Sequence, residues 1–210
     1  MIFPINRAKH KILKHVYENP WCRITDVLKA ANTSQSSGYA YISEMVDAGL
    51  LMESKEGKKP LSRRIAPNFG DAGSMVFALL EAEKLQHLIS RRAELKAPLA
   101  QFRADAGSMV DTALVFGSFA RGAEGRDSDI DIFVLGKKGI SRKLAAIQER
   151  CFVTTRNRVS MRVAETQSFV GALKSGDSFA VQIAKDHVVA VNPLGWVKIL
   201  AAASPGRHEI

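Results

Sequence analysis

The chain has 210 residues and a mass of 23.0 kDa, enough for one medium-sized domain or two small ones that each bury a core. Its 46% hydrophobic and 24% charged residues exclude a disordered or fibrous chain. The longest weakly polar stretch, 188–203, is interrupted by polar residues and too short for a membrane span, and the first residues lack a secretory signal pattern. The chain has only two cysteines, Cys22 and Cys151, far apart in the sequence and in no metal-type spacing, so we expect neither a disulfide framework nor a zinc cluster. We therefore expect a cytoplasmic protein with no membrane partner.

The charge balance favours a polyanionic partner. Thirty Lys and Arg residues against 21 Asp and Glu residues give a formal net charge of +9 at pH 7. Residues 1–70 carry 11 basic and 6 acidic side chains, so this first third is the most basic part of the chain.

Residues 1–70 are expected to form three helices followed by a hairpin. Apolar residues recur at helical spacing over 12–17, and a short helix over 25–31 is expected to start with Thr25 as its N-cap. A third helix is expected over 34–48, capped by its first residue.

A charged hairpin should follow the third helix. Gly49 is expected at positive φ, a strand over 50–53 leads to a charged tip at 54–59, and a second strand returns over 61–65. The segment 53–64 has five basic and two acidic residues, a net charge of +3 that suits contact with phosphates.

This order of elements resembles the winged helix-turn-helix domain of many small prokaryotic transcription regulators, in which the third helix enters the major groove and the wing follows the backbone. The resemblance implies double-stranded DNA as a partner, although winged helices also serve as protein–protein modules. The implied DNA-binding residues are, on the third helix, Ser34, Gln35, Ser36, Ser37 and Tyr39, and, on the wing, Lys55, Lys58, Lys59, Arg63 and Arg64.

Residues 71–106 are expected to be a helical connector. A helical apolar pattern runs over 72–103, and Pro98 is expected to kink or end the helix.

Strands and helices alternate in the last part, 107–210. The residues after 193 show only an apolar segment expected to pack on this domain. The predicted fold class is α+β: an N-terminal winged helix, a helical connector and a small mixed sheet with flanking helices. Strands are expected over 112–116, 129–135, 159–163 and 188–191, and helices over 141–151, 167–173 and 179–185.

Two short motifs in this last part carry chemistry. A buried strand runs into Gly117-Ser118 and then a helix, so backbone N–H groups and the Ser118 hydroxyl should converge as a phosphate cradle. Asp129 and Asp131 lie two apart on a strand, so both carboxylates leave the same face. Paired carboxylates that share phosphate oxygens with a substrate are the usual arrangement for Mg²⁺, and they point to transfer at a nucleoside triphosphate.

The combined pattern, GSFARGAEGRDSDID over 117–131, resembles the signature of the DNA polymerase β-like nucleotidyltransferase superfamily, most closely its minimal nucleotidyltransferase branch. The likeness extends over about 110–192. It implies that Asp129 and Asp131 are catalytic residues that bind Mg²⁺ or Mn²⁺. It also implies that a nucleoside triphosphate is bound by Gly117, Ser118, Arg121 and Ser128.

One position departs from the pattern. Active members of the superfamily usually carry a third carboxylate on the next strand, where this chain has Ser160. Ser160 and Arg162 should face the site, and Glu165 could supply the carboxylate only in a shifted register. The substitution is expected to weaken turnover, and nucleotide binding without efficient transfer stays open as an alternative.

Three functions remain open. The first is nucleotidyl transfer to an unknown acceptor, coupled to DNA binding. The second is a transcription regulator whose second domain only binds nucleotide or forms a homodimer. The third is an antitoxin-like modifier that places a nucleotide on a protein acceptor.

Overall fold

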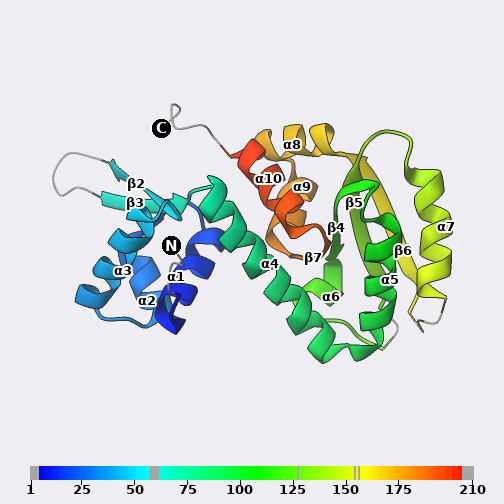
Figure 1. Cartoon of the computed structure of the whole chain (residues 1–210), viewed down its shortest axis with the longest axis horizontal. Coiled ribbons are helices and arrows are strands. Elements are labelled where there is room, and N and C mark those ends of the chain that lie inside the picture. Colours follow the sequence, from blue (N-terminus) through cyan, green and yellow to red (C-terminus); the bar gives the residue numbers. More distant parts are fainter. Residues whose placement is uncertain (1–4, 57–61, 127, 154, 156, 205–210) are drawn as a thin grey trace. The chain divides into compact units, whose positions relative to one another are not determined.

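The structure is a computed structural model that describes residues 5–56, 62–126, 128–153, 155 and 157–204. The chain divides into two compact units, Met1–Phe77 and Ala78–Ile210 (Figure 1). The division falls inside one long helix, α4 (Asp71–Arg91), so the predicted connector is shared between the units.

The first unit packs three helices on a three-stranded antiparallel sheet with strand order β1-β3-β2. Its core is made of fully buried apolar side chains, among them Ile12, Val16, Met45 and Ile65. The ring of Tyr17 stacks on that of Phe77, with 4.9 Å between centroids. The elements are α1 (Arg7–Glu18), β1 (Cys22–Arg23), α2 (Ile24–Ala31), α3 (Gln35–Asp47), β2 (Leu51–Glu56) and β3 (Ser62–Pro67).

Two of the three predicted helix-end features of this unit are confirmed, whereas β2 runs to Glu56 and so includes the first residues of the predicted hairpin tip. Ser34 caps α3, with its Oγ accepting from the Ser37 N–H at 3.2 Å, and Gly49 has a φ of 70°. The predicted N-cap at Thr25 is wrong. The chain stays extended through Arg23, which pairs with Arg64 in the sheet, so α2 begins at Ile24 and Arg23 occupies the cap position.

The long helical pattern of 72–103 is interrupted earlier than predicted. The chain leaves α4 at Arg92, which has a φ of −133°, and passes through a short 3₁₀ turn (Ala93–Leu95) into α5 (Lys96–Ala106). Pro98 therefore lies in the first turn of α5 and does not end a helix. At that position its missing N–H costs no hydrogen bond.

The second unit is built on a four-stranded mixed sheet with order β6-β5-β4-β7, in which β5 and β6 are parallel and the other pairs antiparallel. The predicted α+β class is confirmed. The strands of the second unit are β4 (Val110–Phe116), β5 (Ile130–Gly136), β6 (Val159–Glu165) and β7 (His187–Val191). The helices that follow α5 in this unit are α6 (Gly117–Arg121), α7 (Ser141–Phe152), α8 (Thr166–Lys174), α9 (Ser178–Lys185) and α10 (Pro193–Ala203).

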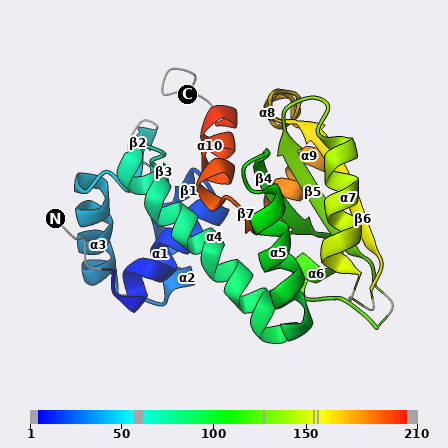
Figure 2. The ribbon, with the colours of Figure 1, turned by 45° about the vertical axis from the view of Figure 1, so that its right-hand side comes forward.

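Helices cover both faces of this sheet (Figures 1 and 2). α5 and α7 pack on one face, where Ile130 and Ile132 of β5 are fully buried. α8, α9 and α10 pack on the other face around Phe133, Phe169 and Trp196. In the part of the chain that the structure describes, no helix is long and apolar enough to cross a bilayer.

α10 was not predicted as a helix. Asn192 caps it by accepting a hydrogen bond from the Gly195 N–H at 3.0 Å, and Pro193 stands at its start. An Asn-Pro pair before an apolar run is a helix-start signal that the sequence offered.

Candidate functional site

The end of β4 brings Gly117 against Asp131. Phe116 is the N-cap of the short helix α6, and Gly117 has a φ of 70°, a conformation that L side chains rarely adopt. A Cβ at Gly117 would lie 2.6 Å from the Oδ2 atom of Asp131. Glycine is therefore favoured here by its positive φ, and it also leaves room for this carboxylate in its present orientation.

The β-sheet register places Asp131 in a row with Ser160. Asp131 pairs with Phe116 on β4 and with Ser160 on β6, and directly paired residues share a face of the sheet. Ser160 thus stands beside Asp131 where the superfamily pattern has its third carboxylate. Glu165 pairs with Gly136 at the far end of β6, so the shifted register that would bring it to the site does not occur.

Charges converge on Asp131. Burial raises the pKa of Asp131 above its ordinary value, and the neighbouring Asp129 carboxylate raises this pKa further. Arg162 and Arg121 lower it, which places both guanidinium groups within electrostatic reach. Asp129 itself is exposed and immediately precedes β5, which begins one residue later than predicted. The site therefore gathers two carboxylates and two cations.

The helix that follows the expected phosphate-binding turn is short. α6 has only five residues, so it offers little of the field of a full helix. Ser118 is partly exposed, and Arg121 is exposed at the end of α6. The turn can still offer backbone N–H groups and the Ser118 hydroxyl to an anion.

Ser128 shapes the loop before Asp129. Its Oγ accepts from the Gly125 N–H at 2.9 Å. Asn157 donates from Nδ2 to the Ser128 carbonyl oxygen at 2.8 Å and thereby holds the same loop from the β6 side. No sequence pattern pointed to Asn157, because its role depends on the pairing of β5 with β6.

α4 anchors the loop after α6 from the other side. Arg91 donates to the Phe119 carbonyl oxygen at 3.3 Å and pairs with Glu124 at 3.2 Å. A Cβ at Gly122 would lie 2.8 Å from the Arg91 guanidinium. Arg91 was not predicted either, since it lies 26 residues before Gly117 in a segment interpreted as a connector.

The candidate metal ligands of this site are the carboxylates of Asp129 and Asp131. Among the described residues, no group of three or more His, Cys, Asp or Glu side chains is close enough to hold a metal ion. Mg²⁺ is commonly bound by one or two carboxylates plus substrate phosphates. Asp131 ends the strand pairing with Phe116, and Asp129 precedes it by two residues and raises its pKa, so the chemistry of these two carboxylates fits Mg²⁺ together with a phosphate ligand.

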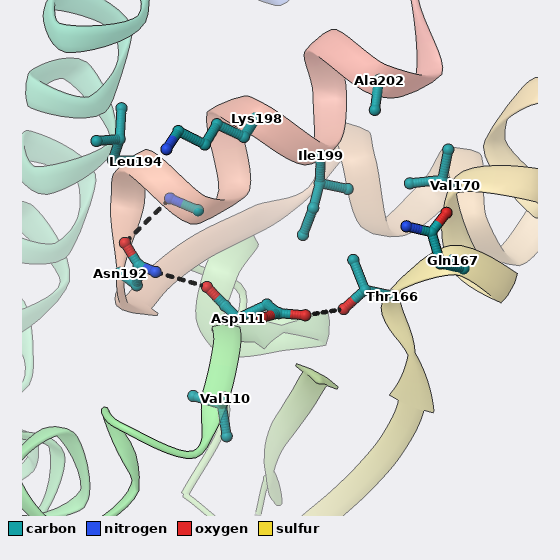
Figure 3. A pocket seen from close by; sticks show the side chains of 11 residues that line it. Val110, Asp111, Thr166, Gln167, Val170, Asn192, Leu194, Lys198, Ile199 and Ala202 are labelled. Atoms are coloured by element: carbon teal, nitrogen blue, oxygen red, sulfur yellow. Dashed lines mark hydrogen bonds between the residues drawn. The ribbon is translucent and has the colours of Figure 1, made fainter. Parts of the chain in front are cut away.

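A pocket of about 410 Å³ lies at the opposite end of β4 and contains none of the predicted site residues (Figure 3). Asp111 lies at an irregularity in the β4 register. Its carboxylate accepts from the Thr166 hydroxyl at 2.6 Å, and its backbone carbonyl oxygen accepts from Asn192 Nδ2 at 2.8 Å. Six residue steps of β4, roughly 20 Å, separate it from the Gly117 turn. This pocket is therefore separate from the Asp129–Asp131 site.

The predicted DNA-reading residues of α3 lie at its start. Gln35, Ser36 and Ser37 are exposed, whereas Ser34 uses its hydroxyl oxygen as the helix cap. Tyr39 is half-buried, with the Arg63 guanidinium 5.3 Å from its ring centroid. The start of α3 and the wing are thus in contact.

The arginines of the wing have protein partners. Arg63 forms two hydrogen bonds with the Glu53 carboxylate, and Arg64 donates to the Trp21 carbonyl oxygen at 2.9 Å. Of the predicted lysines, Lys55 stands opposite Arg63 in the β2–β3 register. Lys58 and Lys59 lie outside the described residues.

A comparison with known proteins finds a family match within the second unit. Residues 99–184 match the family model of the nucleotidyltransferase domain, which confirms the predicted likeness for this stretch of the chain. No curated protein is similar enough to count as a match.

Among solved structures, the crystal structure of the transcriptional regulator SlyA is similar at 18% identity and a TM-score of 0.34, over 43% of this chain. The match spans 61% of the SlyA chain.

Proposed function

We propose that the nucleotidyltransferase domain binds a Mg²⁺–nucleoside triphosphate at the turn after β4 and transfers a nucleotide to an acceptor, and that the first unit binds duplex DNA. The observation that carries the proposal is the placement of Asp131 against Gly117. A carboxylate whose pKa is raised by burial and then by a second carboxylate, beside a turn with no Cβ, is suited to a cation and phosphate oxygens.

Each predicted residue has a role in this proposal. Asp129 and Asp131 hold the divalent ion, which when bound would offset charge on the transferring phosphoryl group. Ser118 and the backbone of the turn donate hydrogen bonds to phosphate oxygens, and Arg121 supplies a cation. Ser128 supports the loop that presents Asp129.

The DNA-binding part rests on the order of elements and on charge. Gln35, Ser36 and Ser37 are exposed at the start of α3, where a recognition helix contacts base edges. The wing carries the basic excess expected of phosphate contacts.

Ser160 favours a second candidate function, nucleotide binding with little transfer. It occupies the place beside Asp131 where a third carboxylate would accept the proton of the attacking hydroxyl. A regulator that senses nucleotide through this domain would need only the binding step.

A labelling assay separates the two candidates. Wild-type protein is incubated with α-labelled ATP, GTP, CTP or UTP, Mg²⁺ or Mn²⁺, and protein and RNA acceptors, beside the Asp129→Asn/Asp131→Asn variant as the matched control. Label on an acceptor that the double variant cannot produce supports transfer. Its absence, together with a gain in Ser160→Asp of about 10²–10⁴-fold over background, supports the binding-only candidate. Label transfer by the double variant contradicts the assigned site.

A further inference from the structure

An aromatic ring is left exposed on the sheet face that carries Asp131. Phe179, in the first turn of α9, packs with its centroid 6.2 Å from that of Phe116 and 5.6 Å from that of Phe133, at 89° and 81°. Phe133 is 4% exposed, whereas Phe179 is 40% exposed. Phe179 is therefore the outer ring of this aromatic cluster, and part of it remains in solvent.

The cluster adjoins the Asp129–Asp131 site. Phe116 is the cross-strand partner of Asp131, and Phe133 follows Asp131 by two residues on β5, so all three side chains share one face of the sheet. Because Phe179 packs on both phenylalanines, its exposed part borders the region next to the Asp131 carboxylate.

A guanidinium group extends the ring surface. The Arg162 Cζ atom lies 5.6 Å from the Phe179 ring centroid, and Arg162 is exposed. Arg162 follows Ser160 by two residues on β6, on the same face, and its charge lowers the pKa of Asp131. Arg162 thus lies beside the exposed ring, on the sheet face that carries Asp131.

We propose that Phe179 and Arg162 form a platform for the base of the nucleoside triphosphate whose phosphates bind at Gly117 and Ser118. Bases stack on aromatic rings and on guanidinium planes, and a flat surface beside the phosphate site is where a base can reach. Every base has a π-face, so the platform binds all four nucleotides with weak discrimination. This inference rests on the proposed nucleotide binding at the same site.

The test compares ligands with and without a base. Dissociation constants of the full-length protein are measured by calorimetry for ATP, UTP and inorganic tripolyphosphate at one Mg²⁺ concentration. Phe179→Ala and Phe179→Leu remove the ring, and the second keeps an apolar side chain against Phe116 and Phe133. Arg162→Lys keeps the charge and removes the guanidinium plane. Val181→Ala is the matched control, since Val181 is 46% exposed on the same helix.

The platform predicts a selective loss. Both Phe179 variants should bind ATP and UTP roughly 5- to 100-fold more weakly, and tripolyphosphate within about twofold of wild type. Arg162→Lys should show a smaller loss of the same kind, and Val181→Ala no loss.

Three results would overturn the inference. Equal losses for tripolyphosphate and nucleotide in the Phe179 variants would indicate structural damage to the phosphate site. Wild-type protein that binds tripolyphosphate as tightly as ATP would leave the proposed phosphate site standing and remove the platform alone. Wild-type protein that binds neither ligand would remove both proposals.

Discussion

At the scale of single residues, the close approach of Gly117 to Asp131 defines the site. From the sequence, Gly117 was expected only as part of a phosphate cradle. The structure adds that its missing Cβ makes room for the Asp131 carboxylate, whose Oδ2 lies 2.6 Å from where that atom would stand. This second role could not be predicted from spacing, because it depends on the β4–β5 register.

Gly117→Ala should therefore be more damaging than alanine at another glycine of similar backbone. Gly139 has a φ of 86°, and a Cβ at that position would have nothing within 4 Å, so Gly139→Ala should cost only the conformational strain, about 1–2 kcal/mol. Gly117→Ala should lower the free energy of unfolding by more than this and abolish nucleotide binding. Urea unfolding of both variants measures the difference, and equal losses would contradict a tight Gly117–Asp131 approach.

The pKa of Asp131 gives a pH-dependent prediction. Because this pKa is raised in the folded protein, ionised Asp131 opposes folding. The cost is absent below the unfolded value of about 3.9 and grows as pH rises through the folded pKa. Without nucleotide or metal, Asp131→Asn should melt above wild type at pH 7, and the difference in Tm should shrink toward pH 4. Thermal melts across this range check it, and a variant that is less stable than wild type at pH 7 would contradict it.

At the scale of elements, local signals were predictable and long-range packing was not. The Ser34 cap and the positive φ of Gly49 follow from residue type at a helix end, and both are observed. The end of α4 at Arg92 and the start of α2 at Ile24 are set by contacts with residues distant in the sequence. Helix propensity alone therefore predicted both helix ends at the wrong residues. In the same way Arg91 and Asn157, which hold the loops on either side of the motif, belong to distant elements.

The wing yields the prediction at this scale. The double variant Lys58→Gln/Lys59→Gln should weaken binding to all duplexes alike, because phosphate contacts carry no sequence information. The plot of log K against log[salt] should also become less steep, by about 0.9 for each phosphate contact that the two lysines make in the wild type. Lys143→Gln, an exposed change on α7 of the other unit, is the control. Fluorescence anisotropy over a salt series measures the slopes.

The arginines of the wing should behave differently from its lysines. Arg63 pairs with Glu53 and Arg64 donates to Trp21, so Arg64→Gln should also lower the stability of the first unit.

A full-length protein that shows no salt-sensitive binding to any duplex would contradict DNA binding and would identify the first unit as a protein-interaction module.

At the scale of the whole molecule, the fold class and the family likeness could be predicted from the sequence, whereas the side chains that surround Asp131 could not. Alternating patterns and the 117–131 motif were enough for the α+β class and for the nucleotidyltransferase likeness that the family match over 99–184 confirms. The net charge of +9 predicted polyanionic partners without saying where they bind. The positions of Ser160, Arg162 and Phe179 around Asp131 required the strand order β6-β5-β4-β7, which no local pattern encodes.

The most direct test of the Asp129–Asp131 site is a calorimetric titration of full-length protein with a nucleoside triphosphate, with Mg²⁺ and with a chelator. If Asp129 and Asp131 hold a divalent ion that binds the phosphates, affinity should depend strongly on Mg²⁺ in the wild type, and Asp129→Asn/Asp131→Asn should remove this dependence. Equal affinity of the wild-type protein with and without Mg²⁺ would contradict the assignment of these two carboxylates.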